Sequence, residues 1–240
     1  MIFNDVNILN IDRTISINKE IPPGMPRREI HTIRGNAGEH LGGVTRERDE
    51  YVVRVNIAAK TAEDAWIVRG KLAAWAMSSG EETAQLIPTH RPDVAYDAIV
   101  SSISAPEFKR GFATVTVSFM LPDPVCYDRM EQRVTGSGTL TFTIGGTMET
   151  EPVVTITPAN ASSFVRCTLD SKKSMALHGT FAAGVPVEID FEKGRVSAGG
   201  ADINETISFE ESSWRLGFTP GEHTLVCTGS AEMRWKNRWA

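Results

Sequence analysis

The stretch FMLPDPVCYD, residues 119–128, decides how this chain divides. It continues FATVTVSF, residues 112–119, in which apolar and polar side chains alternate as they do in a half-buried β-strand. Two prolines follow, and each lacks the N–H that a sheet needs and disfavours helix in the residue before it. The strand is therefore predicted to stop here, leaving two domains, residues 1–128 and 129–240.

The first half has the pattern of a mostly antiparallel β domain with one helix. YVVRVNIA, residues 51–58, alternates strictly, and IFNDVNIL, REIHTI and AYDAIVSSIS add further candidate strands. TAEDAWIVRGKLAAWAM breaks the pattern, because Thr61 and Asp64 have the spacing of a capping box and Gly80 follows the segment as a stop signal. A single helix is predicted over about residues 61–78.

The apolar surface of this helix is wider than the usual stripe. Ala65, Val68, Leu72 and Trp75 fall on one side, and a second apolar side contains Trp66, Ala73 and Met77. Two interpretations stay open: the whole helix is buried under the sheet of its own domain, or its second side packs against another subunit.

A long polar segment, RGNAGEHLGGVTRERDE, separates two of the candidate strands. It has four glycines but neither the Lys nor the following helix of a phosphate-binding loop. We predict a loop or hairpin arm that projects from the β domain, a type of segment that often carries function.

The second half has the pattern of a β-sandwich or jelly roll. Gly, Thr and Ser become frequent, no amphipathic helix is evident, and turns recur between short alternating segments. Eight strands are predicted: GTLTFTI, EPVVTIT, SFVRCTLD, KSMALHG, VPVEIDF, RVSAGG, HTLVCTG and AEMRWK.

Composition excludes several classes of protein. The net charge of −5 is shared by both halves, so neither is a basic nucleic-acid-binding module. No apolar run is long enough to cross a bilayer, and the N-terminus has no export signal. Cys126, Cys167 and Cys227 are odd in number, far apart and without a CxxC motif, so they are interpreted as small buried hydrophobes.

No motif for catalysis, a cofactor or a metal is recognisable, and the chain is predicted not to be an enzyme. Two alternatives stay open. Glu188 with Glu210 or Glu211 would be the carboxylate pair of a glycosidase. Trp214 and Trp239 would stack on sugar rings in a carbohydrate-binding sandwich that recognises host cell-wall glycans.

Several features, taken in order, resemble one family, the distal tail proteins of bacteriophages with long non-contractile tails. The matching segments are IFNDVN (2–7), RGNAG (34–38), KLAAW ending at Trp75, RPDVAYDA (91–98), the junction with Gly111, Phe119, Asp123, Pro124 and Tyr127, and LGFTPGEHTL (216–225). The position of Cys126 after the Asp-Pro step, rather than before it, departs from the family pattern.

The resemblance implies a virion structural protein of a phage or prophage, made in the host cytoplasm and located at the tail tip. Its first domain would form a homohexameric ring, and its second would be a galectin-like sandwich, in the compact form without an inserted carbohydrate-binding domain. The ring would join the major tail tube protein to a tail-associated fibre or lysin, without specific nucleic-acid binding or membrane insertion. The candidate subunit interface comprises Trp66, Ala73 and Met77 of the helix and Arg34, Gly35, Gly38, His40 and Leu41 of the polar segment.

Overall fold

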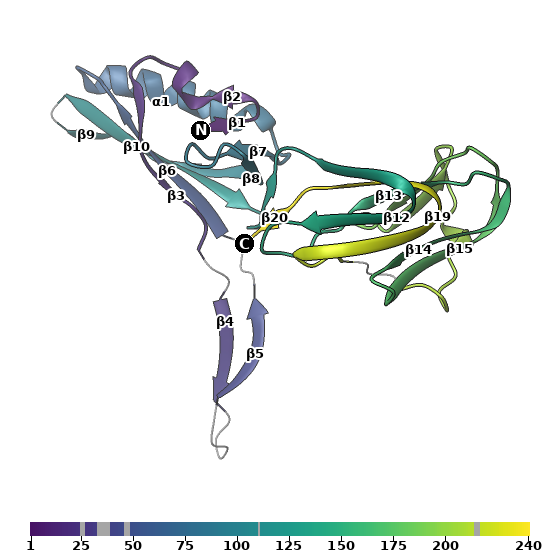
Figure 1. Cartoon of the computed structure of the whole chain (residues 1–240). Helices are drawn as coiled ribbons and strands as arrows, with labels where there is room; N and C mark the ends of the chain where they lie inside the picture. The colour runs from purple at the N-terminus through teal and green to yellow at the C-terminus, as the bar shows by residue number, and fades with distance from the viewer. Residues whose placement is uncertain (25–26, 33–38, 46–48, 110, 214–216) are drawn as a thin grey trace. The chain divides into compact units, whose positions relative to one another are not determined.

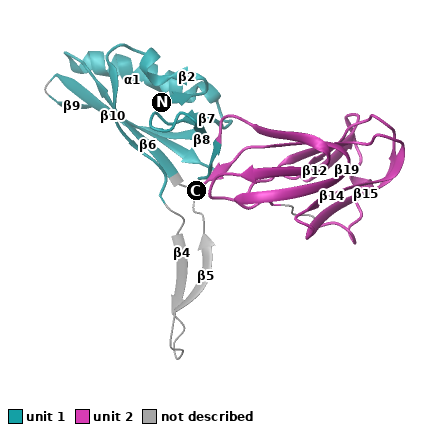
Figure 2. Cartoon of the chain, in the orientation of Figure 1, with its two compact units in different colours: residues 1–127, 240 teal, residues 128–239 magenta. Residues whose placement is uncertain are grey.

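The computed structural model describes residues 1–24, 27–32, 39–45, 49–109, 111–213 and 217–240. The chain forms two compact units, one of Met1–Tyr127 with Ala240 and the other of Asp128–Trp239 (Figure 2). Mainly β structure with one α-helix was predicted, and the described residues confirm it (Figure 1).

The N-terminal unit is an antiparallel sheet with one helix packed on a face. Its strands are β1 (Ile2–Phe3), β2 (Val6–Asn7), β3 (Ile15–Ile21), β4 (Arg27–Thr32), β5 (Glu39–Thr45), β6 (Asp49–Ile57), β7 (Ala84–Ile87), β8 (Val94–Ile103), β9 (Glu107–Lys109), β10 (Phe112–Leu121) and β11 (Cys126–Asp128). The main strand order is β2-β1-β7-β8-β10-β6-β3, with β9 paired to β10 and β11 to β8. Strands β4 and β5 pair with each other as a separate two-stranded sheet.

The alternation in the two most regular strands fixes which face of this sheet is buried. β10 pairs with β6 so that Val115 lies opposite Val55 and Val117 opposite Val53, and all four side chains are fully buried. Because successive side chains in a strand point to opposite faces, this register places one continuous apolar face under the helix.

The predicted helix corresponds to α1 (Ala62–Ala76), followed by the 3-10 turn η2 (Met77–Ser79). Its N-terminus has a complete capping box: Asp64 N donates to Thr61 Oγ1 at 3.1 Å, and Thr61 N donates to Asp64 Oδ2 at 3.2 Å. Trp75 anchors the other end, since its indole N–H donates to Val6 O at 3.1 Å and its ring packs edge-on against Phe3.

Replacing Thr61 with Ala is expected to destabilise the N-terminal unit by about 1 kcal/mol, because the substitution leaves a helix N–H without its acceptor. Urea unfolding followed by circular dichroism would measure the loss. Thr61→Ser keeps the hydroxyl and should unfold close to wild type; equal losses in both variants would contradict this role for the cap.

A second contact holds α1 to the start of the chain. Lys71 Nζ lies 2.6 Å from Asp12 Oδ2, and Thr14 donates to the same carboxylate through its N–H and its hydroxyl. The Lys71 ammonium, followed by the Thr14 hydrogen bonds, lowers the pKa of Asp12 from 3.8 to about 2.

Stability should therefore depend on the charge of Asp12 in acid. A depressed carboxyl pKa contributes stability that is complete above pH 3.8 and is lost as pH falls towards about 2. We expect the urea midpoint of Asp12→Asn to fall less steeply than that of the wild type across this window. Parallel curves for the two proteins would show that Asp12 does not contribute to acid sensitivity.

The beginning of the chain differs from the predicted single strand IFNDVNIL. β1 and β2 form a tight hairpin whose turn residues Asn4 and Asp5 have φ of 47° and 62°. The 3-10 helix η1 (Ile8–Asn10) follows and buries Ile8. Asn and Asp tolerate this left-handed conformation better than other non-glycine residues, which is why the turn can occur without glycine.

The strand before the two prolines ends directly before the first of them. β10 ends at Leu121, directly before the first proline, and Phe119 is fully buried in that strand. Asp123 Oδ1 accepts a hydrogen bond from Val125 N at 3.1 Å, which makes a local turn. Tyr127 OH then donates to Asp97 Oδ1 at 2.6 Å and fastens the end of the N-terminal unit to β8.

The C-terminal unit is a β-sandwich, as predicted. Its elements are β12 (Gln132–Ile144), β13 (Val153–Thr157), β14 (Ser162–Leu169), β15 (Lys173–Phe181), β16 (Val187–Asp190), β17 (Arg195–Ala198), β18 (Ala201–Asp202), the 3-10 helix η3 (Asn204–Thr206), β19 (Gly221–Trp235) and β20 (Arg238–Trp239). The main order is β15-β14-β19-β13-β16-β17-β18, and β12 pairs along β19. Buried side chains from both ends of this order form a single core.

One strand was predicted wrongly as two. HTLVCTG and AEMRWK are both part of β19, whose first half pairs with β14 and whose second half pairs with β13. Gly229 lies at the change of partner, where an added Cβ would be 2.5 Å from Thr157 O. The glycine is there because a neighbouring backbone approaches closely, and not because the chain turns.

Candidate functional site

The most distinctive surface of the N-terminal unit is the outward side of α1. Its inward side is buried under the unit's own core through Ala65, Val68, Leu72, Trp75 and Ala76. The outward side, here called the outer face, comprises Trp66, Ile67 and Ala73 of α1 together with Met77, the first residue of η2. Trp66 is 53% exposed, Ile67 56% and Met77 69%, and Ala73 is half-buried. Among the described residues, then, α1 is covered on one side only.

The outer face is held in a fixed position. Arg69 donates to Ile103 O at 3.0 Å and to Ser104 O at 3.2 Å, which fastens α1 to the end of β8. The same guanidinium lies 5.7 Å from the centre of the Trp66 ring. A cation over an aromatic face restrains the ring. The exposed indole is therefore presented on a rigid element.

The other predicted interface residues belong to the polar segment. Arg34, Gly35 and Gly38 lie outside the described residues. His40 and Leu41 lie in β5, where the register places them opposite His31 and Ile30 of β4. The backbone pairing agrees with a hairpin, and the role of the segment in subunit contacts stays a prediction.

Of the two tryptophans in the glycan-binding alternative, the structure describes only Trp239. Trp214 lies outside the described residues. Trp239 is half-buried, and its indole N–H donates to Asp128 Oδ1 at 2.8 Å. Asn237 donates to the other oxygen of the same carboxylate at 2.7 Å and accepts from Gly145 N at 2.8 Å. Trp239 thus takes part in a polar network with Asp128 and Asn237 that joins the first and last residues of the C-terminal unit.

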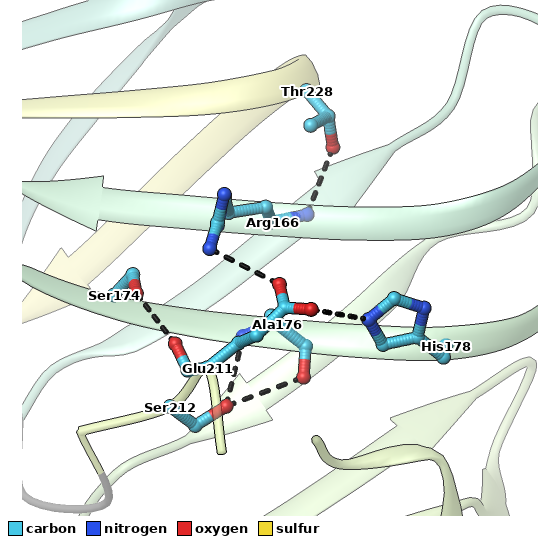
Figure 3. Close-up of polar contacts among 7 residues, drawn as sticks. All are labelled: Arg166, Ser174, Ala176, His178, Glu211, Ser212 and Thr228. Carbon is cyan, nitrogen blue, oxygen red and sulfur yellow. Dashed lines mark hydrogen bonds and ion pairs between the residues drawn. The ribbon is translucent and has the colours of Figure 1, made fainter. Parts of the chain in front are cut away.

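A polar network on the sandwich was not predicted (Figure 3). Glu211 accepts from Arg166 at 3.2 Å and lies 3.3 Å from His178 Nε2, so a loop carboxylate joins β14 to β15. The segment around it also covers the edge of β15, where Ser212 Oγ accepts from Ala176 N at 3.0 Å. Strand pairing places Arg166 opposite Ala176, a relation that sequence spacing alone does not show.

The glycosidase alternative finds its carboxylates in separate ion pairs. Glu188 lies 3.1 Å from Arg234, and Glu211 belongs to the network with Arg166. The two carboxylates thus belong to different ion pairs, and Glu210 is exposed.

Within the described ranges, no three His, Cys, Asp or Glu side chains come together in a way that could hold a metal ion. In the same part of the chain, no helix has the length and apolar content needed to span a bilayer.

Comparison with known proteins found a family match for the C-terminal part of the chain and a fold match for the whole chain. Residues 145–239 match the family model of the siphovirus-type tail component, C-terminal domain. The crystal structure of Dit from phage SPP1 superposes with a TM-score of 0.84 at 15% identity, covering 99% of this chain and 98% of that chain. The baseplate of phage P2 in its activated conformation with calcium contains a chain with a TM-score of 0.51 at 11% identity, covering 93% and 90%. No curated protein sequence matches the chain.

The resemblance inferred from ordered sequence motifs is thereby confirmed by two findings, the family match over residues 145–239 and the whole-chain fold. Residues 145–239 match the siphovirus-type tail component C-terminal domain, and the whole chain has the fold of SPP1 Dit, a siphophage tail hub protein.

Proposed function

We propose that this protein forms the hub ring of a phage tail tip, as a homohexamer that joins the tail tube to a tail-tip fibre or lysin protein. Two things support the proposal. The whole-chain fold is that of SPP1 Dit, which is described as a paradigm of the hub adsorption apparatus of phages that infect Gram-positive bacteria. In addition, the outer face is apolar, lies on a helix that Arg69 fastens to β8, and is left exposed by the part of the chain that the structure describes.

The outer face is the surface that we assign to contacts between subunits. Three large apolar side chains, Trp66 and Ile67 of α1 and Met77 of η2, are more than half exposed. Large exposed apolar side chains on one side of an element are typical of an interaction site, and aromatic residues and Met are enriched in interface cores. The occupant we assign is a second copy of the chain, because a ring needs a surface on each subunit that its neighbour fills.

A ring uses two different surfaces of each subunit, and one surface of each copy contacts the other surface of its neighbour. The ring closes when a whole number of the rotations between neighbours makes one full turn. The outer face would be one of these surfaces. The net charge of −5 per chain also suits the proposal, because a ring of chains with the same sign of charge as DNA phosphates would not hold DNA that passes through it.

Size-exclusion chromatography with light scattering tests the assembly. We expect a species with a mass six times that of the 26.3 kDa chain, whose fraction increases with protein concentration. A monomer at every concentration, including in a mixture with the tail tube protein of the same phage, would overturn the proposal. Labelling of intact virions with an antibody against the chain should mark the tail tip.

A further inference from the structure

Two cysteines that are far apart in sequence lie directly opposite each other in the C-terminal unit. Cys167 of β14 and Cys227 of β19 are register partners, and both carry free thiols. Both side chains are buried in the sandwich core, so both point to the same side of the sheet. The sequence gives no indication of this pairing, because no CxxC motif is present and strand register is not local information.

The backbone hydrogen bonds show whether Cys167 and Cys227 form a hydrogen-bonded or a non-hydrogen-bonded pair of the antiparallel ladder. Asp170 N donates to Thr224 O at 2.9 Å, so the pair 170 and 224 is of the hydrogen-bonded type. In an antiparallel ladder, hydrogen-bonded and non-hydrogen-bonded pairs alternate at each step. Cys167 and Cys227 lie three steps further along the same register, an odd number, which makes them a non-hydrogen-bonded pair.

A non-hydrogen-bonded pair brings side chains closest together. Its Cα atoms are about 4.5 Å apart, inside the range of about 4.4–6.8 Å that a disulfide spans. Two thiols in this position can be joined with little backbone movement.

We propose that Cys167 and Cys227 form a reversible disulfide, with a low-molecular-weight disulfide such as oxidised glutathione as the oxidant. The thiolate of one cysteine attacks the small disulfide, forms a mixed disulfide and releases one small thiol. The second cysteine then attacks the sulfur of the first, which forms the protein disulfide and releases the second small thiol. Two protein thiols are oxidised and one small disulfide is reduced, so electrons and protons balance.

The reaction belongs to folding, or to an open state of the sheet, and not to the closed native core. Burial raises the pKa of the Cys227 thiol to about 11 and raises that of Cys167 further, with Cys227 as a second cause. Because the thiolate is the attacking species, the closed native pair reacts slowly. Once formed, the bond would close a loop of roughly 60 residues and tie β14 to the strand that both halves of the sandwich share.

Refolding the full chain from urea with reduced and oxidised glutathione tests the proposal. After alkylation and digestion without reduction, we expect the alkylated cysteines to fall from three to one. The linked peptide should contain Cys167 and Cys227, with a mass lower by two hydrogens, while Cys126 is alkylated. The oxidised chain should also unfold at a higher temperature, and dithiothreitol should reverse the increase.

The variants separate this bond from other oxidation products. Cys126→Ala should leave the linked peptide unchanged, and Cys227→Ala should abolish it and leave Cys167 alkylated or bound to glutathione. Three alkylated cysteines after refolding, a link that includes Cys126, or glutathione adducts alone would overturn the proposal. The wild-type peptide map does not depend on any variant folding, and the result is independent of whether the ring forms.

Discussion

Lysine at Trp66, Ile67 and Met77 together is expected to convert the assembled protein into monomers. Each of these side chains is already partly covered, so burying the rest of its apolar surface in the assembly is worth about 1–2 kcal/mol, and a lysine there would bring an unpaired charge into the contact. A loss of only about 3 kcal/mol weakens association about 100-fold, so the triple variant should stay monomeric at concentrations where the wild type assembles. Light scattering measures the difference.

A matched control is available in the other unit. Met77 is 69% exposed and Met130 is 78% exposed, so Met77→Lys and Met130→Lys make the same chemical change at two positions that are both largely exposed. Only Met77→Lys should weaken assembly, and neither should change the unfolding temperature of the monomer, since no core contact is removed. Equal assembly of both variants would show that the outer face is not a subunit contact.

Gly146→Ala is expected to destabilise the C-terminal unit by more than about 3 kcal/mol. Gly146 has φ of +86°, and an added Cβ would lie 2.2 Å from Arg238 O, which is backbone and cannot rotate away. The substitution therefore combines left-handed strain with a clash that displaces the return of the chain along β20. Thermal or urea unfolding should show an early transition for this unit, or no folded unit at all.

Gly138 provides the control for conformation alone. Its φ is +78°, close to that of Gly146, but an added Cβ would meet no atom within 4 Å. Gly138→Ala should thus cost only the left-handed strain, about 1–2 kcal/mol. If the two alanine variants unfolded together, the close approach to Arg238 would not be the cause.

Local signals in the sequence predicted local structure well. The Thr61 and Asp64 spacing fixes the start of α1 because a capping box is made by residues three apart. The alternation in residues 112–119 identifies the buried face of β10, since side-chain direction in a strand has a period of two. The prolines end that strand for a reason that is equally local.

The features that escaped prediction depend on distant parts of the chain. Gly229 and Ser230 have the composition of a turn, yet β19 continues through them because Thr157 of β13 approaches the backbone there. The pairing of Cys167 with Cys227 depends on a register between strands that are roughly 60 residues apart. No pattern within a short window contains that information.

The candidate site was predictable from local sequence only in part. The composition of α1 revealed two apolar sides, but only the packing shows that the side with Leu72 is buried and the side with Trp66 is exposed. Likewise, Glu211 was singled out as a carboxylate, but its partners Arg166 and His178 come from two paired strands.

Cryo-electron microscopy of the assembled protein, or of the tail tip that contains it, tests the central claim most directly. The account predicts a closed sixfold ring in which Trp66, Ile67 and Met77 of each copy are buried against the next copy. A particle without a closed ring, or a ring in which this face of α1 stays in contact with solvent, would contradict it.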